Sequence, residues 1–267
     1  AGTGTLSNVI SGSGSVTKTG AGTAILASAN TYTGATDVEQ GTLALSGNGS
    51  IANSSHVEVA AGAALDATFI NTGRTVSGSV HNQGDIYGGT GDNVLTFTGA
   101  VSGAGAFHNS VAFDGTFGPG NSPALVAMDD AVFGATSTTI MELGGLVRGS
   151  EYDAIDALSL VLGGTLQVNL LDLGGGLFAP HLGDTFRLFA ANLIGGMFAN
   201  FDFTNANLGA GLHWDWSVIN EAGRQSFTLF VASDAGDSVP TPAAWTLVML
   251  GCLVILWVRP QAARAPR

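Results

Sequence analysis

The stretch Val16-Thr17-Lys18-Thr19-Gly20-Ala21-Gly22-Thr23, continued by Ala29-Asn30-Thr31-Tyr32-Thr33-Gly34 and by Gly41-Thr42-Leu43-Ala44-Leu45, decides the fold. It consists of short alternations of apolar and small polar residues, which are separated by Gly, Ser, Thr and Asn. Apolar alternations this short predict β-strands, because a helix needs a longer stretch with a different period.

The short strands recur along the chain at a roughly constant interval. Gly-Thr occurs at residues 4, 22 and 41, and residues 76–82 are echoed by residues 101–109. Repeats of this length predict a solenoid, in which each coil covers its apolar face by stacking on the next coil. A β-helix over about residues 1–115 is the simplest such fold, with Thr, Val, Ile and Leu filling the core.

The motif in residues 16–45 resembles the autotransporter-associated β-strand repeat, which is found in passenger regions of Gram-negative surface proteins. The departures are Ala24, where that family prefers Leu, and a more polar turn at residues 37–40. The resemblance implies that the β-helix is parallel and right-handed.

Residues 116–237 have longer strand patterns with larger side chains, such as residues 164–170 and 225–231, and they hold most of the 14 Phe. We expect a β-rich region that closes the end of the solenoid. Short segments between Pro119 and Trp214 occur in the order seen at the end of such passenger regions, and this supports the same expectation.

Residues 238–267 form a linker, an apolar run over 243–258 and an arginine-containing tail. As a helix the run would approach the thickness of a bilayer core, and the arginines after it predict a cytoplasmic C-terminus. The block resembles the PEP-CTERM class of sorting signals, in the variants that read Val-Pro-x-Pro-Ala, although Thr241 replaces the usual Glu. The resemblance implies processing by an exosortase-type membrane protease. The sorting residues would be Val239, Pro240, Thr241, Pro242, Ala243 and Arg259. The alternative is a simple tail anchor.

Composition and charge exclude several classes of protein. Charged residues make up 10% of the chain, which argues against a helical protein with a salt-bridged surface. Residues 1–237 hold all 20 acidic and five of the eight basic residues, a net charge of −15, so neither nucleic acid nor anionic lipid is an expected ligand. The single cysteine, Cys252, excludes an internal disulfide and is expected to be a buried small hydrophobe.

We find no grouping that predicts catalysis. Glu151, Asp153 and Asp156 are expected on a solvated turn beside a strand, and Asp129-Asp130 in a loop. The five basic residues of the body are spread too widely along the sequence to predict a substrate clamp. Residues 120–124 imitate a nucleophile elbow, but Pro123 follows the serine and no helical pattern comes next.

We find no metal or cofactor site either. Residues 88–95 resemble a calcium-binding repeat in a single imperfect copy, so a plain glycine-rich turn is favoured. His81 and His108, each followed by Asn, are too few for a zinc site and predict a ladder of Asn and His on adjacent turns.

The sequence therefore predicts a non-enzymatic protein of a Gram-negative cell surface or extracellular matrix, with a solenoid acting as a stalk or adhesin. The expected partners are the inner membrane through the C-terminal helix, an exosortase-like protease, and exopolysaccharide or other surface polymers. The alternatives are a secreted glycan-active β-helix enzyme and a fragment of an autotransporter passenger. The chain opens at Ala1 without Met and in mid-pattern, which suggests a fragment, and any N-terminal signal peptide would lie upstream of it.

Overall fold

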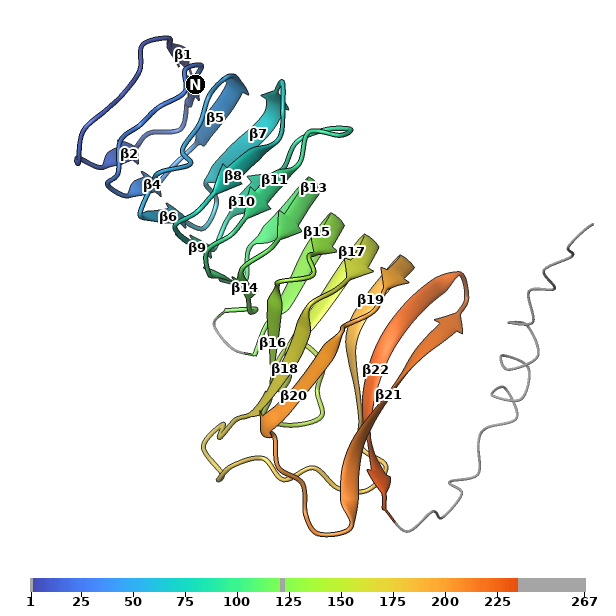
Figure 1. Ribbon diagram of the computed structural model, residues 1–267. Coiled ribbons are helices and arrows are strands. Elements are labelled where there is room, and N and C mark those ends of the chain that lie inside the picture. The colour runs from blue at the N-terminus through green and yellow to red at the C-terminus, as the bar shows by residue number, and fades with distance from the viewer. Residues whose placement is uncertain (1, 121–122, 235–267) are drawn as a thin grey trace, which may run out of the picture.

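A computed structural model describes residues 2–120 and 123–234, and within these residues every regular element is a β-strand (Figure 1). The strands form two sheets that run along the same axis, and successive strands alternate between them for most of the chain. Strand pairing is parallel up to β19 and β20, because each strand pairs with the equivalent strand of the next coil. The prediction of an all-β parallel solenoid is confirmed. Its right-handed winding stays a prediction.

The strands of the two sheets, in chain order, are as follows. The larger sheet contains β1 (Thr3–Leu6), β3 (Thr23–Leu26), β5 (Thr42–Gly47), β7 (Ala64–Ile70), β8 (Arg74–Val76), β10 (Asp85–Tyr87), β11 (Leu95–Phe97), β13 (Ala106–Phe113), β15 (Leu125–Phe133), β17 (Ala154–Leu162), β19 (Thr185–Gly196), β21 (Leu212–Glu221) and β22 (Arg224–Ser233). The smaller sheet contains β2 (Val16–Lys18), β4 (Thr36–Val38), β6 (His56–Val59), β9 (Ser79–Asn82), β12 (Val101–Ser102), β14 (Thr116–Phe117), β16 (Thr138–Leu143), β18 (Thr165–Leu170) and β20 (Asn200–Asn205).

The register of the larger sheet confirms part of the predicted repeat. Thr23 pairs with Thr42, so the Gly-Thr pairs at 22 and 41 occupy equivalent places in successive coils. The predicted equivalence of Gly4-Thr5 with Gly22-Thr23 is wrong by two residues, because Thr3 is the residue that pairs with Thr23. The backbone explains the offset, since the oxygen of Gly2 accepts the hydrogen bond from the Thr23 N–H.

The second predicted echo, between residues 76–82 and 101–109, is also wrong. Val101 pairs with Val80 in the smaller sheet, whereas Val76 pairs with Phe97 in the larger one. The two segments share composition but not position in the coil. A similar order of small residues does not fix register when the turns between strands differ in length.

The core lies between the two sheets and consists of ladders of like side chains. Leu26 pairs with Leu45 among the early coils, and both are fully buried. Further along, Phe97, Phe113 and Phe133 occupy successive places in the larger sheet. Their rings are stacked, with centroids 5.5 Å and 5.3 Å apart. Each coil therefore buries its apolar residues mainly against its neighbours.

The far end of the solenoid is closed by an antiparallel hairpin, which lies in the region of longer strand patterns. β22 pairs antiparallel with β19, and β21 pairs antiparallel with β22 (Figure 1). Trp216 of the hairpin stacks on Phe201 of β20 and on Phe227, with centroids 5.4 Å and 5.6 Å away. This aromatic cluster covers the last coil. The predicted division at residues 115 and 116 stays a prediction, while parallel pairing continues across it.

Phe113→Ala is expected to lower the free energy of unfolding by about 3 to 5 kcal/mol, because it opens a cavity in the buried phenylalanine ladder. Chemical denaturation followed by circular dichroism measures the change. Phe69→Ala is the control, because the Phe69 side chain is 69% exposed and its loss should cost less than about 0.5 kcal/mol. Equal losses for the two variants would contradict this account of the core.

Candidate functional site

The polar residues of the motif in residues 16–45 join successive coils. Asn30 lies on the middle of three coils, and its side-chain oxygen accepts the Ile10 N–H at 2.9 Å. Its side-chain nitrogen donates to the Ser50 oxygen at 3.2 Å on the other side. One buried amide therefore links three coils, and its donor and its acceptor are both in use.

Lys18, in the same motif, is buried and has no acidic partner within the described residues. Its Nζ donates to the backbone oxygens of Thr19 at 3.0 Å, Gly20 at 2.6 Å and Gln40 at 2.8 Å. The three N–H donors of the ammonium group are thus matched by three carbonyls, one of which belongs to the next coil. Lys18 joins two successive coils through these hydrogen bonds, and its donors are not available to a ligand.

Hydroxyl groups and glycines complete the motif. The Tyr32 hydroxyl lies 2.5 Å from the Thr36 hydroxyl, which in turn lies 2.7 Å from the Ser54 hydroxyl, all of them buried. A Cβ at Gly34 would lie 2.4 Å from the oxygen of Gly14 in the preceding coil, so only glycine allows this approach. The motif is a set of contacts for stacking coils.

The acidic group near residue 153 differs from the prediction of a solvated turn. Asp153 is fully buried, and its two oxygens accept the backbone N–H groups of Ala124 at 2.8 Å and Glu142 at 2.9 Å. Burial raises the pKa of Asp153 to about 7, although these two hydrogen bonds favour the charged form. The prediction is wrong for Asp153 because the chain folds inward at this residue before β17.

The Glu151 carboxylate is also bound by hydrogen bonds within the protein. Glu151 accepts hydrogen bonds from the backbone N–H groups of Leu146 at 2.8 Å and Val147 at 2.9 Å, which closes the loop before it. A hollow of about 250 Å³ lies beside Asp153 and Glu142. Asp153 lines this hollow, and each of its two oxygens accepts a backbone N–H group. Hydrogen bonds to both oxygens favour a structural role for the Asp153 carboxyl.

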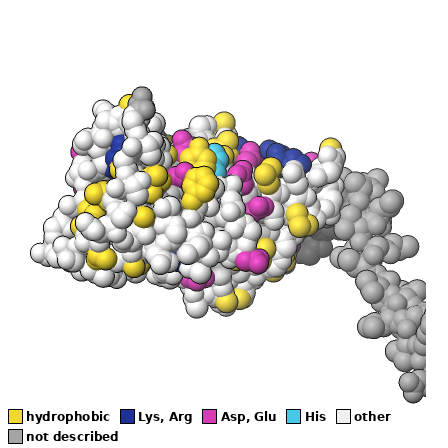
Figure 2. Space-filling model, turned by 90° about the horizontal axis from the view of Figure 1, so that it is seen from above, with side chains coloured by type: hydrophobic (Ala, Val, Ile, Leu, Met, Phe, Trp, Pro, Cys, Tyr) yellow, Lys and Arg dark blue, Asp and Glu magenta, His cyan; other side chains and the backbone are white. Residues whose placement is uncertain are grey.

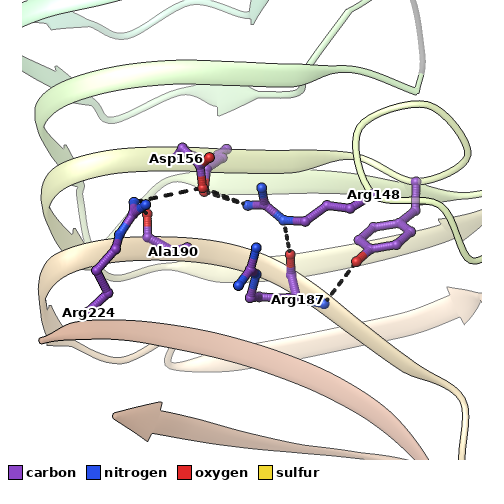
Figure 3. A network of polar contacts seen from close by, with 7 residues as sticks. Arg148, Asp156, Arg187, Ala190 and Arg224 are labelled. Carbon is purple, nitrogen blue, oxygen red and sulfur yellow. Dashed lines mark hydrogen bonds and ion pairs between the residues drawn. The ribbon is translucent and has the colours of Figure 1, made fainter. Parts of the chain in front are cut away.

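Three arginines gather around Asp156, contrary to the expectation that the cations of the body are too spread out to converge (Figure 3). Arg148 donates to the Asp156 carboxylate at 2.9 Å, and Arg224 lies 3.9 Å from the same oxygen. Arg187 enters the cluster from β19, which pairs with both β17 and β22. The expectation failed because the closing hairpin brings together residues up to 76 positions apart in the sequence.

The backbone around Arg187 holds this cluster in place. The Arg148 Nε donates to the Arg187 oxygen at 2.8 Å, and the Arg187 N–H donates to the Tyr152 hydroxyl at 3.3 Å. Burial raises the pKa of Tyr152, while the Arg187 hydrogen bond and the guanidinium groups of Arg148 and Arg187 act in the opposite direction. The register of β19 against β22 shifts between Arg187 and Phe189, which is where these contacts form.

The predicted ladder of Asn and His is wrong, because the two histidines belong to different sheets. His81 lies in β9 and contacts the Ser102 hydroxyl at 3.0 Å. His108 lies in β13, where it stacks on Tyr87 at 4.5 Å and contacts the Asp85 carboxylate at 2.9 Å. The face shown in Figure 2 carries acidic side chains and a histidine close together, with basic side chains gathered beyond them.

Other predictions have mixed outcomes. Residues 88–95 include a turn, as expected, with Gly91 at a positive φ of 62°. Asp129 and Asp130 lie in β15 and not in a loop. No three His, Cys, Asp or Glu side chains within residues 2–120 and 123–234 are arranged to hold a metal ion. In the same two ranges no helix is long and apolar enough to cross a bilayer.

Several predicted residues lie outside the described part of the chain. They are the sorting residues Val239, Pro240, Thr241, Pro242, Ala243 and Arg259, together with Cys252 and the elbow-like pair Asn121-Ser122.

Comparison with known proteins supports the resemblance of the motif. Residues 16–45 match the family model of the passenger-associated-transport-repeat. A stretch of 83 residues is 45% identical to a protein named extracellular serine protease from Serratia marcescens. That match covers 31% of this chain and 8% of the Serratia protein, so the similarity concerns a small part of the relative. The matched family region contains the coil-joining contacts of Lys18, Asn30 and Thr36.

Asn30→Ala is expected to lower the free energy of unfolding by about 1 to 3 kcal/mol, because it leaves the Ile10 N–H and the Ser50 oxygen without their partner. Chemical denaturation measures the loss. Asn8→Ala is the matched control, since Asn8 is exposed. If both variants unfold like the unaltered chain, the three-coil link does not stabilise the fold.

Between about pH 4 and pH 7 the Asp153 carboxyl keeps its proton in the folded chain, whereas an unfolded aspartate has lost it. The folded state then binds more protons than the unfolded state, so the contribution of Asp153 to stability falls as the pH rises through this window. We expect a decrease of roughly 3 to 4 kcal/mol relative to Asp153→Asn, at about 1.4 kcal/mol for each unit of pKa difference.

Urea unfolding at several pH values measures this slope for the unaltered chain, for Asp153→Asn and for the exposed control Asp130→Asn. The pH dependence should flatten only in Asp153→Asn. The same slope in all three proteins would show that Asp153 titrates like an ordinary aspartate.

Proposed function

We propose that this protein is a non-enzymatic exported protein of a Gram-negative cell surface or extracellular matrix, in which the β-solenoid acts as a stalk or adhesin. The observation that carries the proposal is the use of the motif's polar residues. The side chains of Lys18, Asn30 and Thr36 all bond to a neighbouring coil, as expected for a building unit of an elongated rod.

Export is supported by the two similarities. The family model that matches residues 16–45 is named for passenger-associated transport, and the Serratia relative is named an extracellular protein. An acidic body with an excess of 15 negative charges suits a soluble, extended surface component and disfavours nucleic acid as a partner. We propose exopolysaccharide or another surface polymer as the partner class.

Two alternative functions belong to other classes of protein. A secreted glycan-active enzyme on the same fold would need an accessible acid and base, and Glu151, Asp153 and Asp156 are instead bound to backbone N–H groups or arginine. Turnover of a polysaccharide by the purified chain, lost in Glu151→Gln or Asp153→Asn, would favour that enzyme. The other alternative is a fragment of an autotransporter passenger, which the motif match also suits.

For residues 239–267 we propose a sorting role, in which Pro240 and Pro242 keep the approach to the apolar run extended for an exosortase-like protease. The run would hold the chain in the inner membrane until it is processed near residues 239–243. The argument is that a solenoid has no folding use for a predominantly apolar run of sixteen residues, which would be prone to aggregation if exposed.

An epitope placed after Arg267 is expected to be absent from the mature surface protein, as measured by mass spectrometry and by blotting of surface fractions. Replacing Pro240 and Pro242 by Ala should retain the epitope, whereas the control Pro260→Ala, beyond the apolar run, should not. A tag that persists on the exported protein, with no effect of the proline changes, would leave a permanent anchor as the correct description.

A further inference from the structure

The arginine cluster of Arg148, Arg187 and Arg224 carries more positive charge than its surroundings neutralise. Asp156 is the single carboxylate that forms ion pairs with it within the described residues. Arg187 is exposed and forms no ion pair in that part of the chain. Three guanidinium groups against one carboxylate leave a local excess of two positive charges. This excess lies on a body that is otherwise strongly acidic.

Two members of the cluster, Arg148 and Arg224, are held in position before any ligand arrives. Arg148 bonds to the Arg187 and Ile155 oxygens at 2.8 Å and 3.2 Å in addition to Asp156, and 17% of its side chain is exposed. Arg224 bonds to the Ala190 oxygen at 3.2 Å and is about half exposed. Contacts of this kind restrict the rotamers of long side chains, so a ligand loses less affinity to ordering them. In Figure 3 the Arg187 side chain is seen between the side chains of Arg224 and Arg148.

We propose that this cluster binds the carboxylate groups of an acidic polysaccharide, with Arg187 as the main contact and Asp156 as the internal counter-ion that positions Arg148 and Arg224. The inference rests on the proposed role as a surface protein and names the class of polymer that such a protein would hold. The planar fork of an arginine matches a carboxylate through two parallel hydrogen bonds.

The charge of the whole body selects a ligand of low charge density. Nucleic acid carries a charge about every 1.7 Å of duplex, and a long polymer of that kind would be repelled by the acidic coils beyond the cluster. A uronic-acid polymer carries one carboxylate on each sugar and offers apolar ring faces between them. Exposed Leu158 lies two residues after Asp156 on the same face of β17, and exposed Leu193 lies on neighbouring β19, where they can contact such rings.

The competing interpretation is that the arginines only tie the closing hairpin to β17. A purely structural clamp predicts that replacing the exposed Arg187 changes stability or nothing at all. A binding cluster predicts that the same replacement changes affinity for a carboxylated glycan, with little effect on folding, because the contacts of Arg187 to its neighbours come from its backbone.

The experiment measures binding of the full chain to immobilised polygalacturonate, with neutral dextran as the comparison glycan. We expect polygalacturonate to bind and dextran not to bind. Arg187→Gln should weaken binding about tenfold, the loss expected for one charge-assisted contact, and Arg187→Lys should lose part of the affinity because the fork is absent. Arg74→Gln removes the same charge from β8, outside the cluster, and should bind like the unaltered chain. Thermal unfolding of each variant shows that it is folded.

The proposal is overturned if the unaltered chain does not bind polygalacturonate, if dextran binds equally well, or if Arg187→Gln keeps full affinity. It is also overturned if sedimentation shows that Arg187→Gln abolishes self-association of the chain and leaves glycan binding intact, since the acidic side chains of a second copy would then be the partner. Each of these results leaves the surface role standing. That role fails separately, if an antibody to the solenoid does not label intact cells.

Discussion

The structure depends on the close approach of one coil to the next at a shared register. Parallel backbone hydrogen bonds allow adjacent strands a separation of about 4.8 Å, so every turn must also fit within that spacing. Gly34 shows how strict this is, because a Cβ there would lie 2.4 Å from the oxygen of Gly14. Buried polar groups in the same turns must find partners along the axis, and Asn30 and Lys18 find them on neighbouring turns and coils.

The last coil of a solenoid has no following coil to cover its core, and here the closing hairpin covers it. β21 and β22 reverse the direction of pairing and bring Trp216 against Phe201. The reversal has a second effect, because the edge of the hairpin carries Arg224 towards Asp156 on β17. The arginine cluster is thus a product of the way the rod ends, and the same elements serve stability and, in our proposal, recognition.

The distribution of carboxylates bears on the choice between a surface protein and an enzyme. Catalytic acids are usually recognised by a perturbed pKa in an accessible hollow. Asp153 has the raised pKa and lies beside a hollow, but its two oxygens are committed to Ala124 and Glu142. Here the perturbation reflects the burial of a structural carboxyl. Site geometry therefore weighs more than the pKa when function is assigned.

The sequence by itself determined the strand-rich solenoid, the motif at residues 16–45 and the bulky closing region. These depend on local alternation, on glycine at turns and on the size of side chains, all of which can be followed along the chain. It did not determine register at Gly4 or in residues 76–109, because turns of unequal length shift equivalent residues by amounts that composition does not reveal. Only the tertiary structure placed His81 and His108 in different sheets, buried Asp153, and gathered Arg148, Arg187 and Arg224. Those outcomes depend on which segments become neighbours when the hairpin folds back, a long-range contact that no local pattern encodes.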